Sequence, residues 1–71
     1  MRTVFAIKYE KGRREARIHD ESDALHERFF VRFYRQGHYV ATWGPYCDGE
    51  SAKTDLSAYL QKENTAGVKI V

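Results

Sequence analysis

Residues 29–43, FFVRFYRQGHYVATW, decide the fold class of this chain. Two runs of aromatic and β-branched residues flank Gln36-Gly37, a pattern typical of a β-hairpin. Pairing outward from this turn places three pairs opposite one another: Tyr34 and Tyr39, Phe30 and Trp43, and Arg32 and Ala41. Both faces of the hairpin then carry large hydrophobic side chains. The core of a small domain accounts for one of these faces, and the other needs a different explanation.

The more aliphatic face is the one that we expect a helix to cover; it carries Phe29, Val31, Phe33, Val40 and Thr42. The aromatic face should stay partly open, because a single helix covers one side of a sheet. That face carries Phe30, Arg32, Tyr34, Tyr39, Ala41 and Trp43. A three-residue turn would shift these pairings. The alternative is that this face is a second small core, covered by residues 20–27 or by another copy of the chain.

The N-terminal residues predict another hairpin. TVFAIKYE, residues 3–10, alternates in polarity and is followed by Lys11-Gly12, which can turn the chain. The expected partners are Tyr9 with Arg14, Lys8 with Glu15, Ile7 with Ala16, and Phe5 with Ile18. This register gathers the apolar residues on one face and sets opposite charges side by side on the other.

Residues 20–27, DESDALHE, have the composition of a short helical turn, with Asp20 as its cap and acids in its first turn. A longer helix over residues 13–28 is the competing prediction, because Ile18, Ser22, Leu25 and Phe29 share one helical stripe. The longer helix would give the ferredoxin-like order βαββαβ.

The clearest helix covers residues 51–64, SAKTDLSAYLQKEN, in which Ala52, Leu56, Tyr59 and Leu60 form an apolar stripe. Asp48 or Ser51 can cap its start. VKIV, residues 68–71, reads as a closing strand. The sequence therefore predicts a single small α+β domain over residues 1–71, with two hairpins and a C-terminal strand in one antiparallel sheet and one main helix on one face.

The composition is that of a folded chain of 71 residues with a net charge of +2, which is too balanced to indicate a nucleic-acid binder. The single cysteine, Cys47, and the short apolar run that ends at Lys8 favour a cytoplasmic protein without a membrane span. The three histidines and Cys47 lack metal-binding spacing. We expect no cofactor, no metal and no enzymatic activity.

Three resemblances bear on function. The run FVRF, residues 30–33, resembles the end of the RNA-contacting signature of the RRM fold, although His26 and Glu27 replace the basic residue and glycine at its front. Residues 28–62 resemble the sheet-then-helix DNA-binding domains of tyrosine-recombinase arm regions and AP2 proteins. The general architecture looks like that of the small phage and mobile-element proteins that block host nucleases, including anti-CRISPR proteins.

The first hypothesis for function is a small inhibitor or adaptor whose arginine and aromatic residues dock on a protein partner, because these residue types dominate interaction hot spots. An anti-CRISPR-like inhibitor from a phage or mobile element fits this description. The alternative is a sheet-type nucleic-acid binder that stacks bases and neutralises phosphates. A third possibility is homodimerisation. The predicted partner-binding residues are Arg28, Phe30, Arg32, Tyr34, Arg35, Tyr39 and Trp43.

Overall fold

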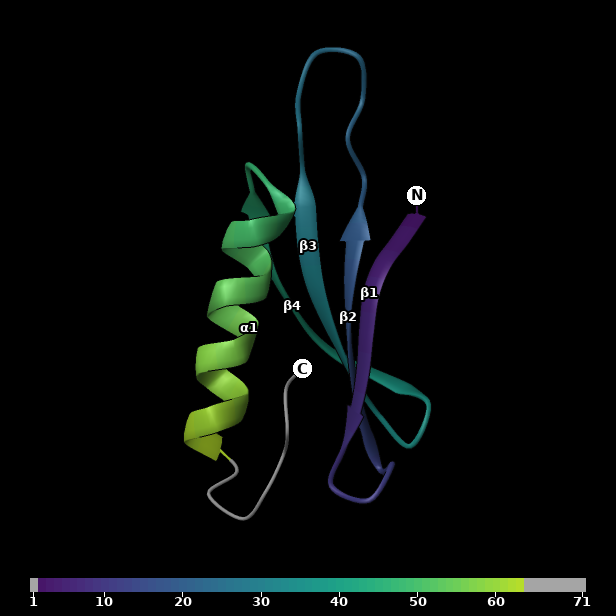
Figure 1. Cartoon of the computed structure of the whole chain (residues 1–71). Coiled ribbons are helices and arrows are strands. Elements are labelled where there is room, and N and C mark those ends of the chain that lie inside the picture. Colours follow the sequence, from purple (N-terminus) through teal and green to yellow (C-terminus); the bar gives the residue numbers. More distant parts are fainter. Residues whose placement is uncertain (1, 64–71) are drawn as a thin grey trace.

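The computed structural model describes residues 2–63, which form a four-stranded antiparallel sheet with one helix on one side (Figure 1). The elements are β1 (Arg2–Tyr9), β2 (Arg14–Asp20), β3 (Phe29–Arg35), β4 (His38–Tyr46) and α1 (Gly49–Glu63). The strands lie side by side in chain order. The predicted α+β sheet with one main helix is confirmed, whereas the predicted strand over residues 68–71 lies outside the described residues.

The register of the first hairpin is the predicted one. Tyr9 faces Arg14, Lys8 faces Glu15 and Ile7 faces Ala16, and Phe5 faces Ile18 beyond them. The connecting turn passes through positive φ at Glu10, Lys11 and Gly12. A bulge between Thr3 and Phe5 shifts the register at the start of β1.

The core lies between the sheet and α1. Ala16, Ile18, Val31 and Phe33 point from β2 and β3 toward the helix, which buries Ala52, Leu56 and Leu60 against them. Tyr59 completes the predicted helical stripe and is partly buried beside this cluster. We call this side of the sheet the helix face.

Asp48, one of the two predicted capping residues, caps the start of α1. Its carboxylate accepts a hydrogen bond of 2.7 Å from the backbone N–H of Ser51, which stabilises the first turn. The same hydrogen bond favours the ionised carboxylate and lowers the pKa of Asp48.

The prediction of a short helical turn over residues 20–27 is wrong, and so is the alternative of a helix over residues 13–28 with its ferredoxin-like order. Residues 14–20 form β2, in which Ala16 and Ile18 alternate with polar residues at the strand period of two. Residues 21–28 form an irregular loop that projects beyond the sheet (Figure 1). The carboxylate of Asp23 accepts hydrogen bonds from two backbone N–H groups of the loop, which favours a tight turn over a helix.

The predicted assignment of the β4 side chains to the two faces of the sheet is also wrong beyond the turn. Tyr34 faces Tyr39 as expected, but the next pairs are Phe33 with Ala41 and Val31 with Trp43. The register shifts between Phe33 and Tyr34, where β4 contains one extra residue. Because side chains alternate along a strand, this bulge turns Ala41 and Trp43 to the helix face and Thr42 away from it.

Candidate interaction surface

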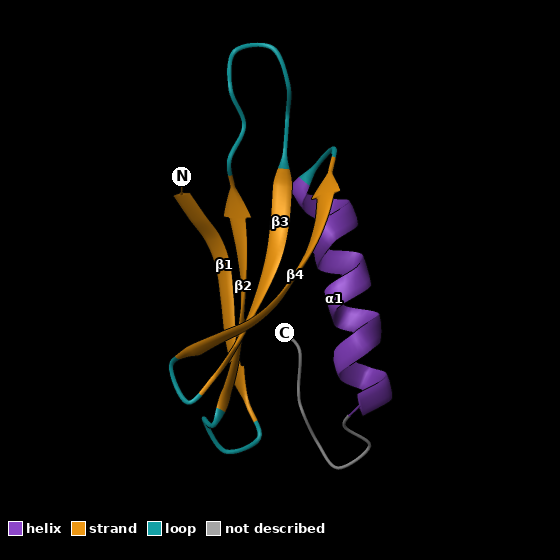
Figure 2. Cartoon of the chain, turned by 180° about the vertical axis from the view of Figure 1, so that it is seen from behind, coloured by secondary structure: helices purple, strands orange, loops and turns teal. Residues whose placement is uncertain are grey.

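The side of the sheet that faces away from α1 is the candidate site, and we call it the open face (Figure 2). Within residues 2–63 no helix packs on it, because the only helix covers the opposite side. Its side chains come from positions that alternate with the buried residues of each strand. The open face includes Ala6 and Lys8 from β1, Glu15, Arg17 and His19 from β2, Phe30, Arg32 and Tyr34 from β3, and Tyr39 and Thr42 from β4.

One arginine–aromatic unit forms across β2 and β3. The guanidinium carbon of Arg17 lies 4.6 Å from the centroid of the Tyr34 ring. Both carboxylate oxygens of Glu15 accept hydrogen bonds from Arg17, at 2.9 Å from Nε and 3.2 Å from Nη2. These hydrogen bonds lower the pKa of Glu15 and raise that of Arg17, so both groups are charged at neutral pH. The pair fixes the guanidinium over the tyrosine ring.

A second unit of the same kind is centred on Arg32. Its guanidinium carbon lies 5.1 Å from the centroid of the Phe30 ring. Arg32 Nη1 donates hydrogen bonds to the carboxylate of Glu21 and, at 3.0 Å, to Nδ1 of His19. The cation is thus held by one carboxylate, one imidazole and one aromatic ring.

His19 is the one side chain of the open face that is almost completely buried, with 3% of its surface exposed. Burial is the main cause of its lowered pKa, and the neighbouring Arg32 cation adds to the effect. Because Nδ1 accepts from Arg32, the proton of the neutral imidazole resides on Nε2. Nε2 is buried without a hydrogen-bond partner in the described part of the chain.

Tyrosines occupy the part of the open face nearest the β3–β4 turn. The rings of Tyr34 and Tyr39 meet edge to face, with centroids 6.3 Å apart. The hydroxyl groups of Tyr39 and Thr42 lie 2.7 Å apart in a hydrogen bond. More than half of the Tyr39 side chain is exposed. It combines apolar area with a polar group that can bind a partner.

Comparison with protein-family models, curated proteins and solved structures finds no match for this chain. In residues 2–63 no three histidine, cysteine, aspartate or glutamate side chains gather in a way that could hold a metal ion. The helix in that part of the chain is not long and apolar enough to cross a membrane.

The structure brings together four of the seven residues predicted to bind a partner: Phe30, Arg32, Tyr34 and Tyr39 all lie on the open face. Arg28 and Arg35 lie at opposite ends of β3. Arg28 forms an ion pair of 2.7 Å with Asp23 in the loop before the strand, and Arg35 faces His38 beside the β3–β4 turn.

Trp43 lies on the opposite face of the sheet from the predicted one. Its ring is on the helix face, where it packs edge to face on Phe33, with centroids 4.6 Å apart, and on Tyr59, with centroids 5.1 Å apart. The expected placement of Trp43 on the open face is therefore wrong. The bulge in β4 is the reason.

Sequence reasoning missed the contribution of β2. Glu15, Arg17 and His19 alternate with the apolar residues of REARIHD, so their common face could be read from the sequence. The sequence did not predict the pairing of β2 with β3, which sets Arg17 opposite Arg32 and His19 opposite Phe30. That pairing joins two hairpins into one surface.

Proposed function

We propose that this chain is a small non-enzymatic protein-binding domain of the inhibitor or adaptor type, and that it docks on its partner through the open face. The observation that carries the proposal is the pair of arginine–aromatic units, Arg17 on Tyr34 and Arg32 on Phe30. Arginine and tyrosine are enriched where protein interfaces derive most of their binding energy.

Preorganisation supports this role. Each guanidinium is already fixed by hydrogen bonds to a carboxylate and by stacking on a ring. A side chain that is ordered before binding loses little conformational entropy when a partner arrives. The exposed Tyr39 ring extends this surface toward the β3–β4 turn.

Charge favours a protein partner over a nucleic acid. Glu15 and Glu21 neutralise the two central arginines of the open face. A phosphate group would have to compete with these carboxylates, whereas an uncharged or mixed protein surface would not. The exposed free thiol of Cys47 is compatible with a reducing compartment, which supports a cytoplasmic site of action.

We propose that the protein is an inhibitor carried by a phage or mobile element. It would block a host defence protein in the manner of anti-CRISPR proteins, as the general architecture suggests. The support for this proposal is the combination of a small domain and a preorganised docking surface.

Nucleic-acid binding is the second candidate, and the aromatic rings of Phe30, Tyr34 and Tyr39 on one sheet face favour it. Bases stack on such rings in single-strand binders. Fluorescence anisotropy with labelled single-stranded RNA and duplex DNA at 50 and 200 mM salt separates the two functions. Binding that weakens steeply with salt would favour nucleic acid, and no binding at 50 mM would eliminate it.

Affinity capture from the cells that express the protein tests the first candidate. We expect one protein to be retained by the wild type and lost with both Arg17→Ala and Tyr39→Ala. The control is Gln61→Ala, on the exposed surface of α1, which should retain it. Equal capture by all four proteins would refute docking through the open face.

A further inference from the structure

The two ends of the molecule carry opposite net charges. The loop of residues 21–28 projects at one end, and the β1–β2 and β3–β4 turns lie at the other (Figures 1 and 2). We call the loop the acidic loop, because it carries Glu21, Asp23 and Glu27 against one arginine, Arg28. Each end adjoins one arginine–aromatic unit, because Glu21 of the loop binds Arg32 and Tyr34 near the β3–β4 turn stacks with Arg17.

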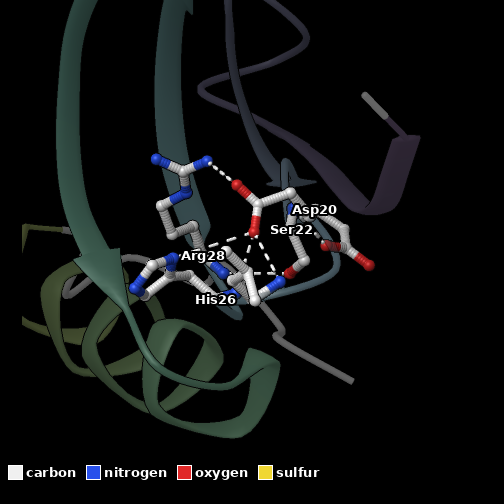
Figure 3. Close-up of polar contacts among 6 residues, drawn as sticks. Asp20, Ser22, His26 and Arg28 are labelled. Carbon is white, nitrogen blue, oxygen red and sulfur yellow. Dashed lines mark hydrogen bonds and ion pairs between the residues drawn. The ribbon is translucent and has the colours of Figure 1, made fainter.

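The acidic loop is held in shape by polar contacts (Figure 3). Asp23 accepts hydrogen bonds from the backbone N–H groups of Leu25, at 2.9 Å, and His26, at 2.8 Å, and it forms an ion pair with Arg28. Ser22 Oγ accepts a hydrogen bond of 2.9 Å from the backbone N–H of Arg28. Backbone hydrogen bonds join Glu21 to Arg28 and Asp23 to His26 across the loop.

This framework presents a leucine to solvent. Leu25 is 86% exposed, more than any other large hydrophobic residue that the structure describes. An exposed leucine on an ordered loop can enter an apolar pocket with little loss of conformational entropy. Glu27 lies two residues away and makes no ion pair with another residue of the described range.

A pocket of about 430 Å³ lies at the opposite end, between the ends of the strands and α1. Its apolar walls are Tyr9, Phe33, Val40, Ala41, Trp43 and Tyr59. Arg14, Arg35 and Tyr34, the tyrosine of the Arg17 unit, also line it. Arg14 pairs with Glu10 at 2.8 Å, whereas Arg35 makes no ion pair within residues 2–63.

The charge around the pocket is opposite to that of the acidic loop. The turns at this end carry Lys11, Arg13, Arg14 and Arg35 against the single acid Glu10. Some of these residues also line a polar depression beside the pocket, which includes Lys11, Arg13 and Arg35. Within the loop, Glu21 pairs with Arg32 and Asp23 pairs with Arg28. Glu27 is therefore the loop carboxylate that can match Arg35 beside the apolar cavity.

We propose that copies of this chain associate head to tail, with Leu25 of one copy inserted in the pocket of the next and Glu27 facing Arg35. The two surfaces are different, so the contact is heterologous, and repetition of it produces a ring or an open chain of copies. Apart from Tyr34, which also lines the pocket, the proposal uses residues outside the arginine–aromatic units, and it does not depend on open-face binding.

Sedimentation velocity from 10 µM to 1 mM at 50 mM salt tests the association. We expect the average mass of the wild type to rise with concentration, and we expect 500 mM salt to weaken it several-fold because the charged contacts are exposed. Leu25→Ser should raise the dissociation constant by about tenfold or more, since it removes the buried leucine. The matched control is Ala24→Ser, at the exposed neighbouring position, which should leave it unchanged.

Mixing variants tests the head-to-tail geometry. Val40→Asp places a carboxylate in the pocket at a residue that is 58% exposed, so the fold should be retained; circular dichroism checks this. Arg35→Glu is a second pocket variant at an exposed residue. Val40→Asp and Leu25→Ser should each be largely monomeric, but their mixture should form one-to-one pairs, because each variant keeps the surface that the other has lost.

Three results would overturn the proposal. The first is a wild type that remains monomeric at 1 mM protein and 50 mM salt. The second is association that is unaffected by Leu25→Ser or by both pocket variants. The third is a mixture of Leu25→Ser and Val40→Asp that fails to pair, which would indicate a symmetric contact through one surface.

Discussion

Replacing Trp43 by alanine should destabilise the domain far more than replacing Tyr39 by alanine. Both residues belong to the face that the sequence predicts to be open, but the structure separates them. The Trp43 ring packs on Phe33 and Tyr59 on the helix face. The Tyr39 side chain is 59% exposed and contacts Tyr34 and Thr42 on the open face.

The magnitude follows from burial and ring contacts. Truncation of a fully buried tryptophan costs about 3–5 kcal/mol, and each edge-to-face ring contact contributes about 0.5–1.5 kcal/mol. Trp43 is half-buried with two such contacts, so we expect Trp43→Ala to lower the free energy of unfolding by about 2–3 kcal/mol. Tyr39→Ala should cost about 0.5–1 kcal/mol.

The loss for Trp43→Ala is large for a domain of this size, whose total stability should be roughly 4–10 kcal/mol. The midpoint of thermal unfolding should fall by about 10–20 °C. Trp43 is the only tryptophan, so unfolding is followed by far-ultraviolet circular dichroism in urea and on heating. Equal stability losses for the two variants, or a greater loss for Tyr39→Ala, would refute the assignment of the two faces.

Two further predictions concern His19 and Gly44. The pKa of His19 is lowered in the folded state, so the stability it contributes is complete above its unfolded pKa of about 6.5 and is lost as the pH falls toward the lower folded value. In urea titrations, the free energy of unfolding should decline from pH 7 to pH 5 by at most about 1.4 kcal/mol per pH unit. His19→Gln should reduce this decline, whereas the exposed control His38→Gln should not. An unchanged decline in His19→Gln would contradict the prediction. Gly44 has a φ of 131°, and a Cβ there would lie 2.9 Å from the carbonyl oxygen of Phe29, so Gly44→Ala should cost about 2 kcal/mol or more. Gly37→Ala, with a φ of 82° and open space around the site, should cost only about 1 kcal/mol in the same urea titration, and equal costs would show that the close contact at Gly44 is not limiting.

The first hairpin was predictable because several independent signals agree on one register. The alternation of β1, the turn residues and the Lys8–Glu15 pair all point to the observed pairing. The helix was predictable for a similar reason, since Ala52, Leu56 and Leu60 recur at the helical period and are all buried.

The second hairpin was predictable only up to its bulge. β-Branched and apolar residues alternate through Val40, Ala41, Thr42 and Trp43, so either face of β4 could pack on a helix. One extra residue in the strand decides between the two faces without changing this pattern. The placement of Trp43 depends on tertiary packing against Phe33 and Tyr59, which sequence periodicity does not report.

The loop of residues 21–28 shows the same limit. Its acids suit the start of a helix, but Asp23 instead closes a turn inside the loop. The open face was partly predictable, because the residues of β3 keep their expected sides. The ion pairs that fix Arg17 and Arg32 come from β2 and from the loop and required the three-dimensional arrangement.

Photocrosslinking from the open face tests the central claim most directly. A benzoylphenylalanine in place of Tyr39 keeps an aromatic ring at an exposed site, and the same residue in place of Gln61 reports on the outer surface of α1. In the cells that express the protein, we predict that the Tyr39 position crosslinks to one protein partner and the Gln61 position does not. Crosslinks from the Tyr39 position to nucleic acid, or the same products from both positions, would contradict the proposed docking through the open face.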